Sequence, residues 1–229
     1  AEASIVCELG DAVLPEDEEI FDFSFPESAG SPNPHLWTNP PMVAEYATVV
    51  HDVLAAVAPD DADLFDSNLD SFTSRIDALD RAVHEASATL PPEDRLLLTY
   101  HDAYAYFARE YDWTVVGAVQ PSSFAEPTPR EVAGLVEQIR ELGVAAIFGS
   151  EVFPSPVLRQ IADETGVIYV DDLRDDDLPG GPGDPDHSWL GLMRLNLITI
   201  VVTLGGDAAA IAASDLTPAA ADQAIYPQE

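Results

Sequence analysis

Three short stretches of the sequence carry the side chains that could do chemistry at a metal ion. His35 lies in Asn-Pro-His-Leu-Trp-Thr-Asn-Pro, His101 lies 66 residues later in Thr-Tyr-His-Asp-Ala-Tyr, and Asp171 follows after a further 70 residues, behind an apolar run. Two imidazoles and one carboxylate suit zinc, and less strongly manganese or iron, better than they suit calcium or copper(I). His35, His101 and Asp171 are therefore the candidate metal ligands of this chain.

The expected positions of His101 and Asp171 favour treating these two residues as a pair. The apolar runs at 96–100 and 167–170 are predicted to be strands of a parallel sheet, and His101 and Asp171 come directly after them. Open parallel sheets bind their ligands beyond the carboxyl ends of the strands. Either residue alone could be an ordinary helix-start or loop side chain, but two on one edge favour a shared ligand. His35 lies in a proline-bracketed loop, where a histidine is more often a surface residue.

The elements that must position these residues follow from the periodicity of the apolar side chains. A helix is predicted to begin after Asn39, with Pro40 in its first position. A second, much longer helix is predicted over 61–88, because apolar residues there alternate spacings of four and three. At 1.5 Å per residue it would be roughly 40 Å long, which is longer than a usual crossover helix and suggests a spine. Its apolar seam consists of Phe65, Leu69, Phe72, Ile76, Leu79 and Val83.

The second half of the chain has a different rhythm. From residue 95 onward predicted strands and helices alternate, which indicates an α/β fold with a parallel sheet and helices on its faces. Thr128 and Glu131 form the sequence pattern of a capping box, with a proline between them at the first helical position. Ahead of the long helix, short strands are expected at 4–9 and 20–25.

Composition restricts the possible partners. The chain of 229 residues has 42 acidic and 9 basic residues, all nine of them arginine, and a net charge of −33. So strong a negative charge repels nucleic acids and anionic membrane surfaces, and neither is an expected partner. Cys7 is the single cysteine, so no intrachain disulfide can form. The most apolar run, at 197–204, is too short to span a bilayer and is expected to be a buried helix.

Other polar features of the sequence are interpreted as structural. His51 and His84 fall within helices, away from the apolar seams, and are expected to be solvated, while His187 lies near a run of acids. The acidic, glycine-rich stretch at 175–184 lacks the ligand spacing of a calcium loop. No glycine-rich phosphate loop follows a strand and no Gly-x-Ser-x-Gly elbow occurs, which weakens nucleotide-binding and hydrolase interpretations.

Taken in order, the motifs of this chain resemble those of the zinc- and manganese-binding solute-binding proteins of bacterial ABC importers, the family of periplasmic zinc-binding proteins and metal-binding adhesin lipoproteins. The family's Asp-Pro-His-hydrophobic-Trp-hydrophobic-Asp-Pro motif is matched by residues 33–40, and its His-x-Ala-(Phe/Tyr)-x-Tyr-(Phe/Leu) motif by residues 101–107. Its Glu-Pro-Ser/Thr-Pro helix start is matched by residues 126–129, and its last ligand, an aspartate after a strand, falls on Asp171.

The resemblance implies two α/β lobes with parallel sheets flanked by helices, joined by one long spine helix, with the metal in the cleft between them. His35 would come from the first lobe, and His101 and Asp171 from the second. The expected function is extracytoplasmic capture of zinc, or next manganese, and its delivery to an ABC import permease by a monomeric protein that is not an enzyme. The chain would then divide into the remainder of the N-terminal lobe at 1–60, the linking helix at 61–90, the C-terminal α/β lobe at 91–206 and a weakly ordered tail at 207–229.

Two departures from the family pattern keep alternatives open. The family's first ligand is a histidine well upstream of the second, but no histidine precedes His35 here, so the N-terminal lobe is expected to be incomplete and the chain truncated at its N-terminus. The stretch at 15–34 is acidic and holds no histidine, unlike the His-rich loop of zinc-specific members, and this weakens a zinc-only assignment. A histidine rather than a glutamate at position 101 favours zinc, because nitrogen ligands suit that ion. Three ligands with an open position would also suit a mononuclear metallohydrolase, and a metal-containing surface adhesion module is a further alternative.

Overall fold

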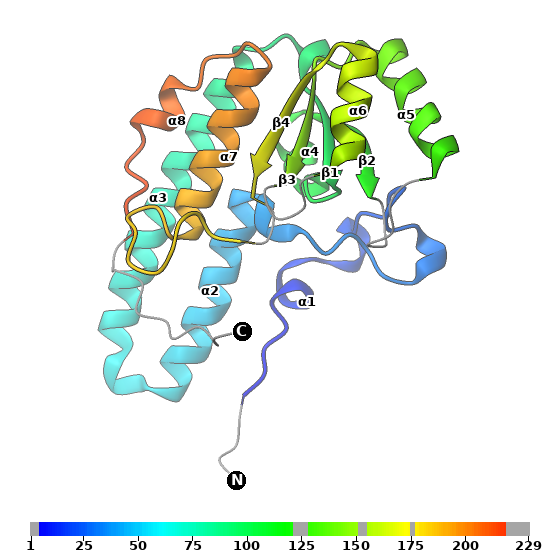
Figure 1. Cartoon of the computed structure of the whole chain (residues 1–229). Coiled ribbons are helices and arrows are strands. Elements are labelled where there is room, and N and C mark those ends of the chain that lie inside the picture. The colour runs from blue at the N-terminus through cyan, green and yellow to red at the C-terminus, as the bar shows by residue number, and fades with distance from the viewer. Residues whose placement is uncertain (1–4, 121–127, 151–154, 175–176, 219–229) are drawn as a thin grey trace.

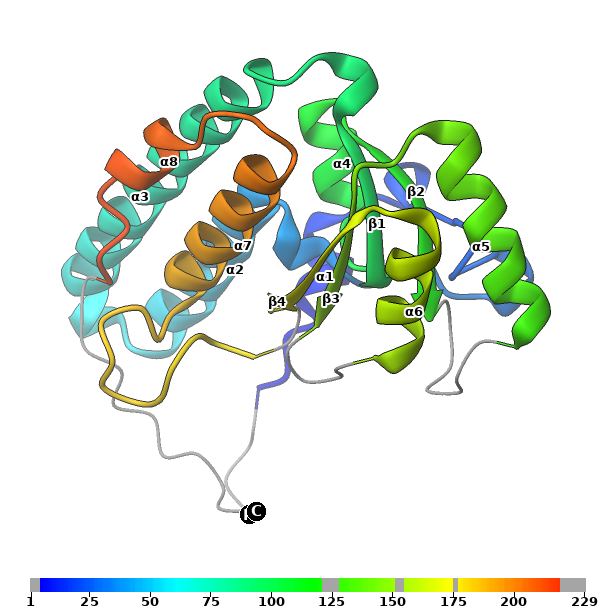
Figure 2. The same cartoon turned by 45° about the horizontal axis from the view of Figure 1, so that its top comes forward.

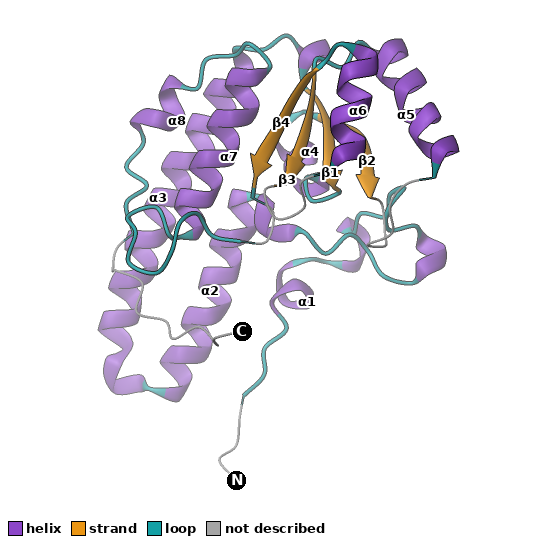
Figure 3. Ribbon diagram, viewed as in Figure 1, coloured by secondary structure: helices purple, strands orange, loops and turns teal. Residues whose placement is uncertain are grey.

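The chain forms a parallel sheet with helices on both of its faces. The computed structural model describes residues 5–120, 128–150, 155–174 and 177–218 (Figure 1). Within these ranges the sheet has four strands in the order β2-β1-β3-β4, and every neighbouring pair is parallel. This confirms the α/β class predicted from the alternation of elements, and Figure 3 shows the helices packed around the strands. The strands are β1 (Leu96–His101), β2 (Thr114–Gln120), β3 (Ala146–Ser150) and β4 (Ile168–Leu173).

The two faces of the sheet bury separate apolar clusters. Successive side chains of a strand point to opposite faces, and Leu97 and Leu98, which are 0% and 1% exposed, accordingly belong to different clusters. The cluster that contains Leu97 is formed with α3, α4, α7 and α8, and the cluster that contains Leu98 is formed with α5 and α6. The helices concerned are α3 (Ala62–Ala88), α4 (Ala105–Tyr111), α5 (Pro129–Leu142), α6 (Pro156–Thr165), α7 (Trp189–Thr203) and α8 (Ala209–Ala213).

The predicted long helix is present as α3, which has 27 residues. Its seam is buried only in the C-terminal half, where Ile76, Leu79 and Val83 are at most 1% exposed. Phe65 and Phe72, in the other half, are half-buried and line a groove of about 390 Å³ against α2 (Pro40–Val57). The seam therefore changes its partner along the helix, from α2 to the main core, and Figure 2 shows α2 and α3 side by side.

The sequence signals that begin and end helices are confirmed where the structure describes them. Asn39 caps α2, since its side chain accepts a hydrogen bond from the amide of Met42. Thr128 and Glu131 form the reciprocal bonds of a capping box at α5, and Gly143 ends that helix with a φ of 68°. Residues 126 and 127 of the helix-start motif lie outside the described residues.

The two strands expected ahead of the long helix are not formed. Residues 5–8 are exposed and have no regular structure, α1 is a short helix at Leu9–Val13, and residues 20–25 form loops and bends. A strand needs a neighbour for its backbone groups, and no strand precedes Leu96 in the described part of the chain. This N-terminal segment instead runs below the strand arrowheads, at the carboxyl edge of the sheet (Figure 1).

The tail was predicted to be weakly ordered from residue 207, and this prediction is wrong as far as residue 218. The segment forms α8 and packs on α3, with Ile211 0% and Leu216 4% exposed. The turn before it passes so close to the end of α3 that a Cβ at Gly206 would lie 2.9 Å from side-chain atoms of Leu90 and Thr89. Small alanines around Ile211 let this short helix approach the core, and residues 219–229 lie outside the described residues.

Two strand ends differ from the prediction at the positions that matter for the site. β1 includes His101, which was expected to follow the strand, and α4 begins only at Ala105. β4 continues through Asp171 to Leu173, so Asp171 lies within the strand rather than after it. The apolar run at 197–204 is part of the buried helix α7, as expected, and none of the described helices is long and apolar enough to cross a membrane. The proposed division of the chain at 60, 90 and 206 stays a prediction.

Candidate metal centre

The structure brings His35 and His101 into direct contact at the carboxyl edge of the sheet. Their Nε2 atoms are 2.8 Å apart and their ring centroids are 4.6 Å apart. His35 is 4% exposed and His101 is half-buried. The loop histidine that sequence reasoning took for an average surface residue is therefore a buried partner of the strand histidine, as the family resemblance implied.

Three buried side chains hold the loop of His35 onto the turn that follows His101. Each donates a hydrogen bond to a backbone carbonyl of the segment that follows β1: two of the acceptors lie in the turn between β1 and α4, and the third lies in the first turn of α4. Because these bonds join segments that are more than 60 residues apart in sequence, they fix the relative position of the two histidines. The bonds are Asn33 Nδ2 to Asp102 O at 3.2 Å, Thr38 Oγ1 to Ala103 O at 2.8 Å and Asn39 Nδ2 to Tyr106 O at 3.2 Å.

Asn33 also sets the tautomer of His35. Its Nδ2 donates to Asp22 Oδ2 at 2.9 Å and to the carbonyl of Asp102, so both amide hydrogens are engaged and the amide oxygen must face His35. That oxygen lies 2.7 Å from His35 Nδ1 and also accepts the backbone N–H of His35 at 3.1 Å. Nδ1 of His35 therefore carries the hydrogen, and its Nε2 presents a lone pair toward His101. A hydrogen on Nε2 of His101 completes the contact, and a metal ion would take the place of that hydrogen.

The surroundings of His35 keep its imidazole neutral. The rings of Phe25 and Trp37 pack against it, with centroids 5.7 and 5.0 Å away. Burial, and to a lesser extent the neighbouring His101, lower the pKa of His35 to about 3, against a smaller rise from Asp22. Metal binding requires the neutral imidazole. His35 is thus ready to act as a ligand without first losing a proton at neutral pH.

A buried acid directly follows His101 in the sequence. Asp102 is 0% exposed, and neither of its carboxyl oxygens has a hydrogen-bond partner within the described part of the chain. Burial raises the pKa of Asp102 to about 7, and the nearby charge of Asp22 raises it too. The folded protein therefore holds a proton on Asp102 over much of the range in which an exposed aspartate would be ionised.

Asp171 is in the same sheet but pairs with Arg159 and is not grouped with the two histidines. Its Oδ2 accepts a hydrogen bond from Arg159 Nη2 at 3.1 Å, with side chains 48% and 63% exposed respectively. The ligand atoms of His35, His101 and Asp171 do not form a group within 4.8 Å in the described structure. The arrangement supplies two of the three predicted ligands as a pair and keeps the third at a distance.

A β-bulge lies at the position of Asp171. Phe148 is opposite Val170, but Ser150 is opposite Leu173, so β4 contains one residue more than β3 between these two pairs. A bulge re-aims the side chains next to it and is common beside functional sites. The extra residue is one of Asp171 and Asp172, both of them exposed, and neither the bulge nor the choice between the two acids could be read from the sequence.

The sheet order sets the span that a metal site would have to bridge. β3 lies between β1, which carries His101, and β4, which carries Asp171. Neighbouring strands are about 4.8 Å apart, so the two backbones are roughly 10 Å apart. The Nε2 atom of a histidine lies about 4.5 Å from its Cα and an aspartate oxygen about 3.5 Å from its own, and two metal–ligand bonds of about 2 Å each add to this reach. Both side chains can therefore contact one ion over the end of β3.

The other candidate histidines have different roles. His51 contacts Asp52 and Asp66 through opposite ring nitrogens, at 3.0 and 2.7 Å. His187 Nδ1 lies 3.0 Å from the carbonyl oxygen of Pro179 and holds the loop before α7. Sequence reasoning missed Asn33 as a positioning residue, although an asparagine two residues before a candidate ligand was a usable signal.

The sequence and the fold were compared with those of known proteins. Residues 2–203 match the profile of a family described as the periplasmic component A of the zinc-uptake complex, ZnuA. The chain is similar to the manganese-binding lipoprotein MntA of Halalkalibacterium halodurans, with 25% identity over 76% of this chain and 58% of that protein. It is also similar to the iron-binding protein YfeA of Yersinia pestis, with 27% identity over 77% of this chain and 57% of that protein. The chain thus spans less than two thirds of the length of these relatives.

A solved structure has the same fold. The periplasmic zinc-binding protein TroA from Treponema pallidum superimposes with a TM-score of 0.77 at 23% sequence identity, over 89% of this chain and 73% of that one. This likeness confirms the fold class. The family match independently supports the resemblance drawn from the motifs at 33–40 and 101–107.

Proposed function

Since the chain belongs to the family of periplasmic zinc-uptake component A proteins, we propose that it captures a divalent transition metal ion outside the cytoplasm and delivers it to an ABC import permease. Zinc is the preferred ion in this proposal and manganese the next. The observation that carries the proposal is the contact of 2.8 Å between the Nε2 atoms of His35 and His101. Two buried or half-buried imidazoles that face each other through the same nitrogen are poised to share one ion.

The geometry of the pair is close to that of a zinc site. Zinc–nitrogen bonds of 2.0–2.1 Å in a tetrahedral site place two ligand nitrogens roughly 3.3 Å apart. The pair would have to open by about 0.5 Å from its separation of 2.8 Å. His35 is held by Asn33 and serves as the fixed ligand, while this small adjustment falls to His101, which is half-buried.

Asp171 closes the site in this proposal. Its ion pair with Arg159 is largely exposed, and exposed ion pairs contribute at most about 1 kcal/mol. Releasing the carboxylate toward the ion is therefore cheap compared with the free energy of a metal–carboxylate bond. A carboxylate with two imidazoles is a set that both zinc and manganese accept.

The setting of the protein fits a cargo carrier. The family is periplasmic by its description, and the relatives are named as metal-binding proteins or lipoproteins, so the protein's place is extracytoplasmic and its action is binding rather than turnover. A net charge of −33 attracts cations to the surface and raises their local concentration. The permease as the receiver of the metal follows from the family alone.

Zinc binding by matched variants tests the proposal. Isothermal calorimetry with a competing chelator, at fixed pH and ionic strength, should give one tight zinc per chain in the wild type. Asp171→Ala and His101→Ala should each weaken this binding by about 100-fold or more, since loss of a contact outside the first coordination sphere already costs 10–100-fold. Asp172→Ala, on the adjacent exposed residue, is the control and should change it less than threefold. Equal effects of Asp171→Ala and Asp172→Ala would remove Asp171 from the site, and no effect of His101→Ala would remove the site itself.

A further inference from the structure

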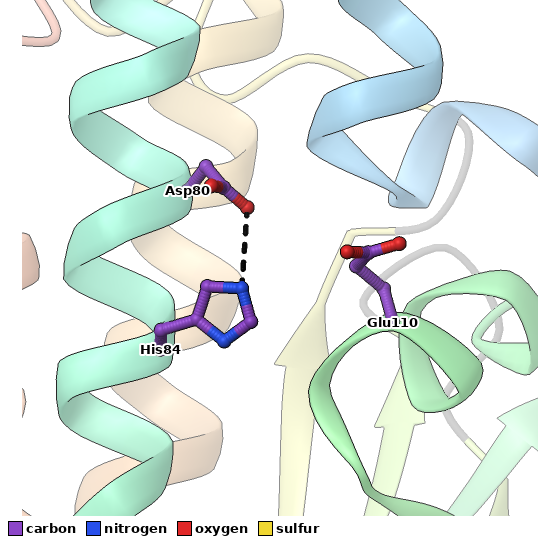
Figure 4. Close-up of side chains that lie close together, drawn as sticks. All are labelled: Asp80, His84 and Glu110. Carbon is purple, nitrogen blue, oxygen red and sulfur yellow. Dashed lines mark ion pairs between the residues drawn. The ribbon is translucent and has the colours of Figure 1, made fainter.

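A second group of potential metal ligands lies on the helices, away from the histidine pair. Asp80 and His84 of α3 and Glu110 of α4 each offer one ligand atom, and these atoms all lie within 4.8 Å of one another. Among the described residues, no other group of three or more histidine, cysteine or acidic side chains has its ligand atoms this close together. Figure 4 shows the three side chains extending into the same space from two different helices.

The two residues of α3 form a preorganised half of the group. Asp80 and His84 are four residues apart, so they lie on the same face of the helix. His84 Nε2 is 3.7 Å from Asp80 Oδ1, the contact that is drawn as a dashed line in Figure 4. Asp80 is half-buried, which limits the positions that its carboxylate can take.

The buried side chain of Tyr111 contacts both Asp80 and His84. Its side chain is 2% exposed, its hydroxyl donates a hydrogen bond of 2.8 Å to Asp80 Oδ1, and its ring packs edge-on against His84 at a centroid distance of 4.8 Å. Burial and the bond to Asp80 raise the pKa of Tyr111 far above its usual value, so its hydroxyl remains a donor. One buried side chain thus orients both the carboxylate and the imidazole, as second-sphere residues do at metal sites.

From these contacts we infer that Asp80, His84 and Glu110 form a second, weaker site for a divalent transition metal ion. One imidazole nitrogen and two carboxylate oxygens form a donor set that suits zinc, and also manganese or cobalt. Glu110 is exposed at the end of α4 and can move by the small distance that closes the group around an ion. His84 is exposed, as expected from the sequence, and the neighbouring helix α4 brings a third potential ligand to it.

The histidine at position 51 shows what distinguishes this group from an ordinary histidine between acids. His51 contacts Asp66 and Asp52 through its two opposite ring nitrogens. A single ion cannot contact both of these nitrogens or lie between the two carboxylates. His84, by contrast, faces Asp80 and Glu110 from one side. Substitution of His51 therefore offers a matched control for substitution of His84.

The test uses the full chain with both histidines of the pair replaced by alanine. Zinc binding at the second site is then measured without any contribution from the site of the proposed function. Zinc titration of the double variant His35→Ala/His101→Ala should still give one bound ion, of lower affinity than the main site. Adding His84→Ala or Glu110→Gln to this background should weaken that binding by about 10-fold or more. Adding His51→Ala should leave it within about twofold. Circular dichroism of every variant checks that the fold is retained.

A structural readout separates specific from diffuse binding. Anomalous scattering from zinc-soaked crystals, or the 15N chemical shift of the His84 imidazole during a zinc titration, should locate the ion at His84 in the double variant. The inference is overturned if the double variant binds no zinc at millimolar concentration. It is overturned equally if the remaining zinc is insensitive to His84→Ala and Glu110→Gln, or responds to His51→Ala as strongly as to His84→Ala.

Discussion

Asn33 is the residue whose replacement tests the architecture of the metal centre most directly. Its buried amide bonds to Asp22, to the carbonyl of Asp102 and to two nitrogens of His35. Leucine has a similar size but makes none of these bonds. At a net contribution of about 1 kcal/mol for each hydrogen bond, partly offset by the apolar side chain, Asn33→Leu should lower the free energy of unfolding by about 3 kcal/mol. Asn68→Leu, on the exposed surface of α3, should change it by less than about 0.5 kcal/mol.

The same substitution should weaken metal binding through the tautomer of His35. Without the amide oxygen, Nδ1 of His35 loses the acceptor that holds its hydrogen in place, and removal of such a partner typically costs 10–100-fold in affinity. Asn33→Asp separates the two effects. It keeps an acceptor for Nδ1, so zinc affinity should stay within about tenfold of the wild type, but it places a carboxylate 2.9 Å from Asp22 and should destabilise the fold.

Competition titration with a chelator measures zinc affinity, guanidinium unfolding measures stability, and 15N NMR of the imidazole reports the tautomer of His35 in the metal-free protein. The reasoning predicts that Asn33→Leu lowers both affinity and stability, whereas Asn33→Asp lowers mainly stability. If Asn33→Leu binds zinc within twofold of the wild type, the bond to Nδ1 has no role in the site. If both variants lose affinity equally, the cause is the damaged fold rather than the tautomer.

Further predictions concern the ligand type, the core and the pH dependence. His101→Glu should shift the preference between zinc and manganese toward manganese by about tenfold, because an oxygen ligand suits the harder ion, and competitive dialysis with an unchanged ratio would contradict a ligand role for His101. Leu79→Ala should lower the free energy of unfolding by about 2–5 kcal/mol, because Leu79 is fully buried. Phe72→Ala should cost less than the roughly 3–5 kcal/mol of a fully buried ring, because Phe72 is only half-buried, and a loss at or above that range would be inconsistent with this burial. Asp102→Asn should gain stability relative to the wild type as the pH rises: with a folded pKa of about 7 against 3.8, the contribution of Asp102 is complete below about pH 3.8 and is lost toward pH 7. Unfolding curves at pH 4 and 7.5 measure this difference, and a constant gap between the two proteins would refute a raised pKa.

The local features of the fold were predictable from the sequence because they depend on neighbouring residues. The caps at Asn39 and Thr128 and the long helix over 61–88 all follow from short-range hydrogen bonds and from apolar periodicity. The alternation after residue 95 likewise indicated a parallel sheet, and the carboxyl ends of its strands indicated where a ligand would bind. The motif around His35 identified that residue only through the family resemblance.

The predictions that were wrong share one physical cause. The tail around Ile211 is ordered because the end of α3 offers it an apolar surface, and the strands expected near residues 4–9 and 20–25 lack a neighbouring strand among the described residues. Whether a short segment is ordered depends on the area that it can bury against distant parts of the chain. No local pattern reports that area.

By itself the sequence determined the kinds of candidate ligand, their order along the chain and the elements that carry them. Only the tertiary structure decided which side chains meet. Bonds from a loop to a turn some 65 residues away bring His35 to His101, and a one-residue bulge in β4 lies at Asp171. Packing of α3 against α4 brings Glu110 to His84. Contacts of this kind depend on the register and packing of whole elements, and a shift by a single residue would change them.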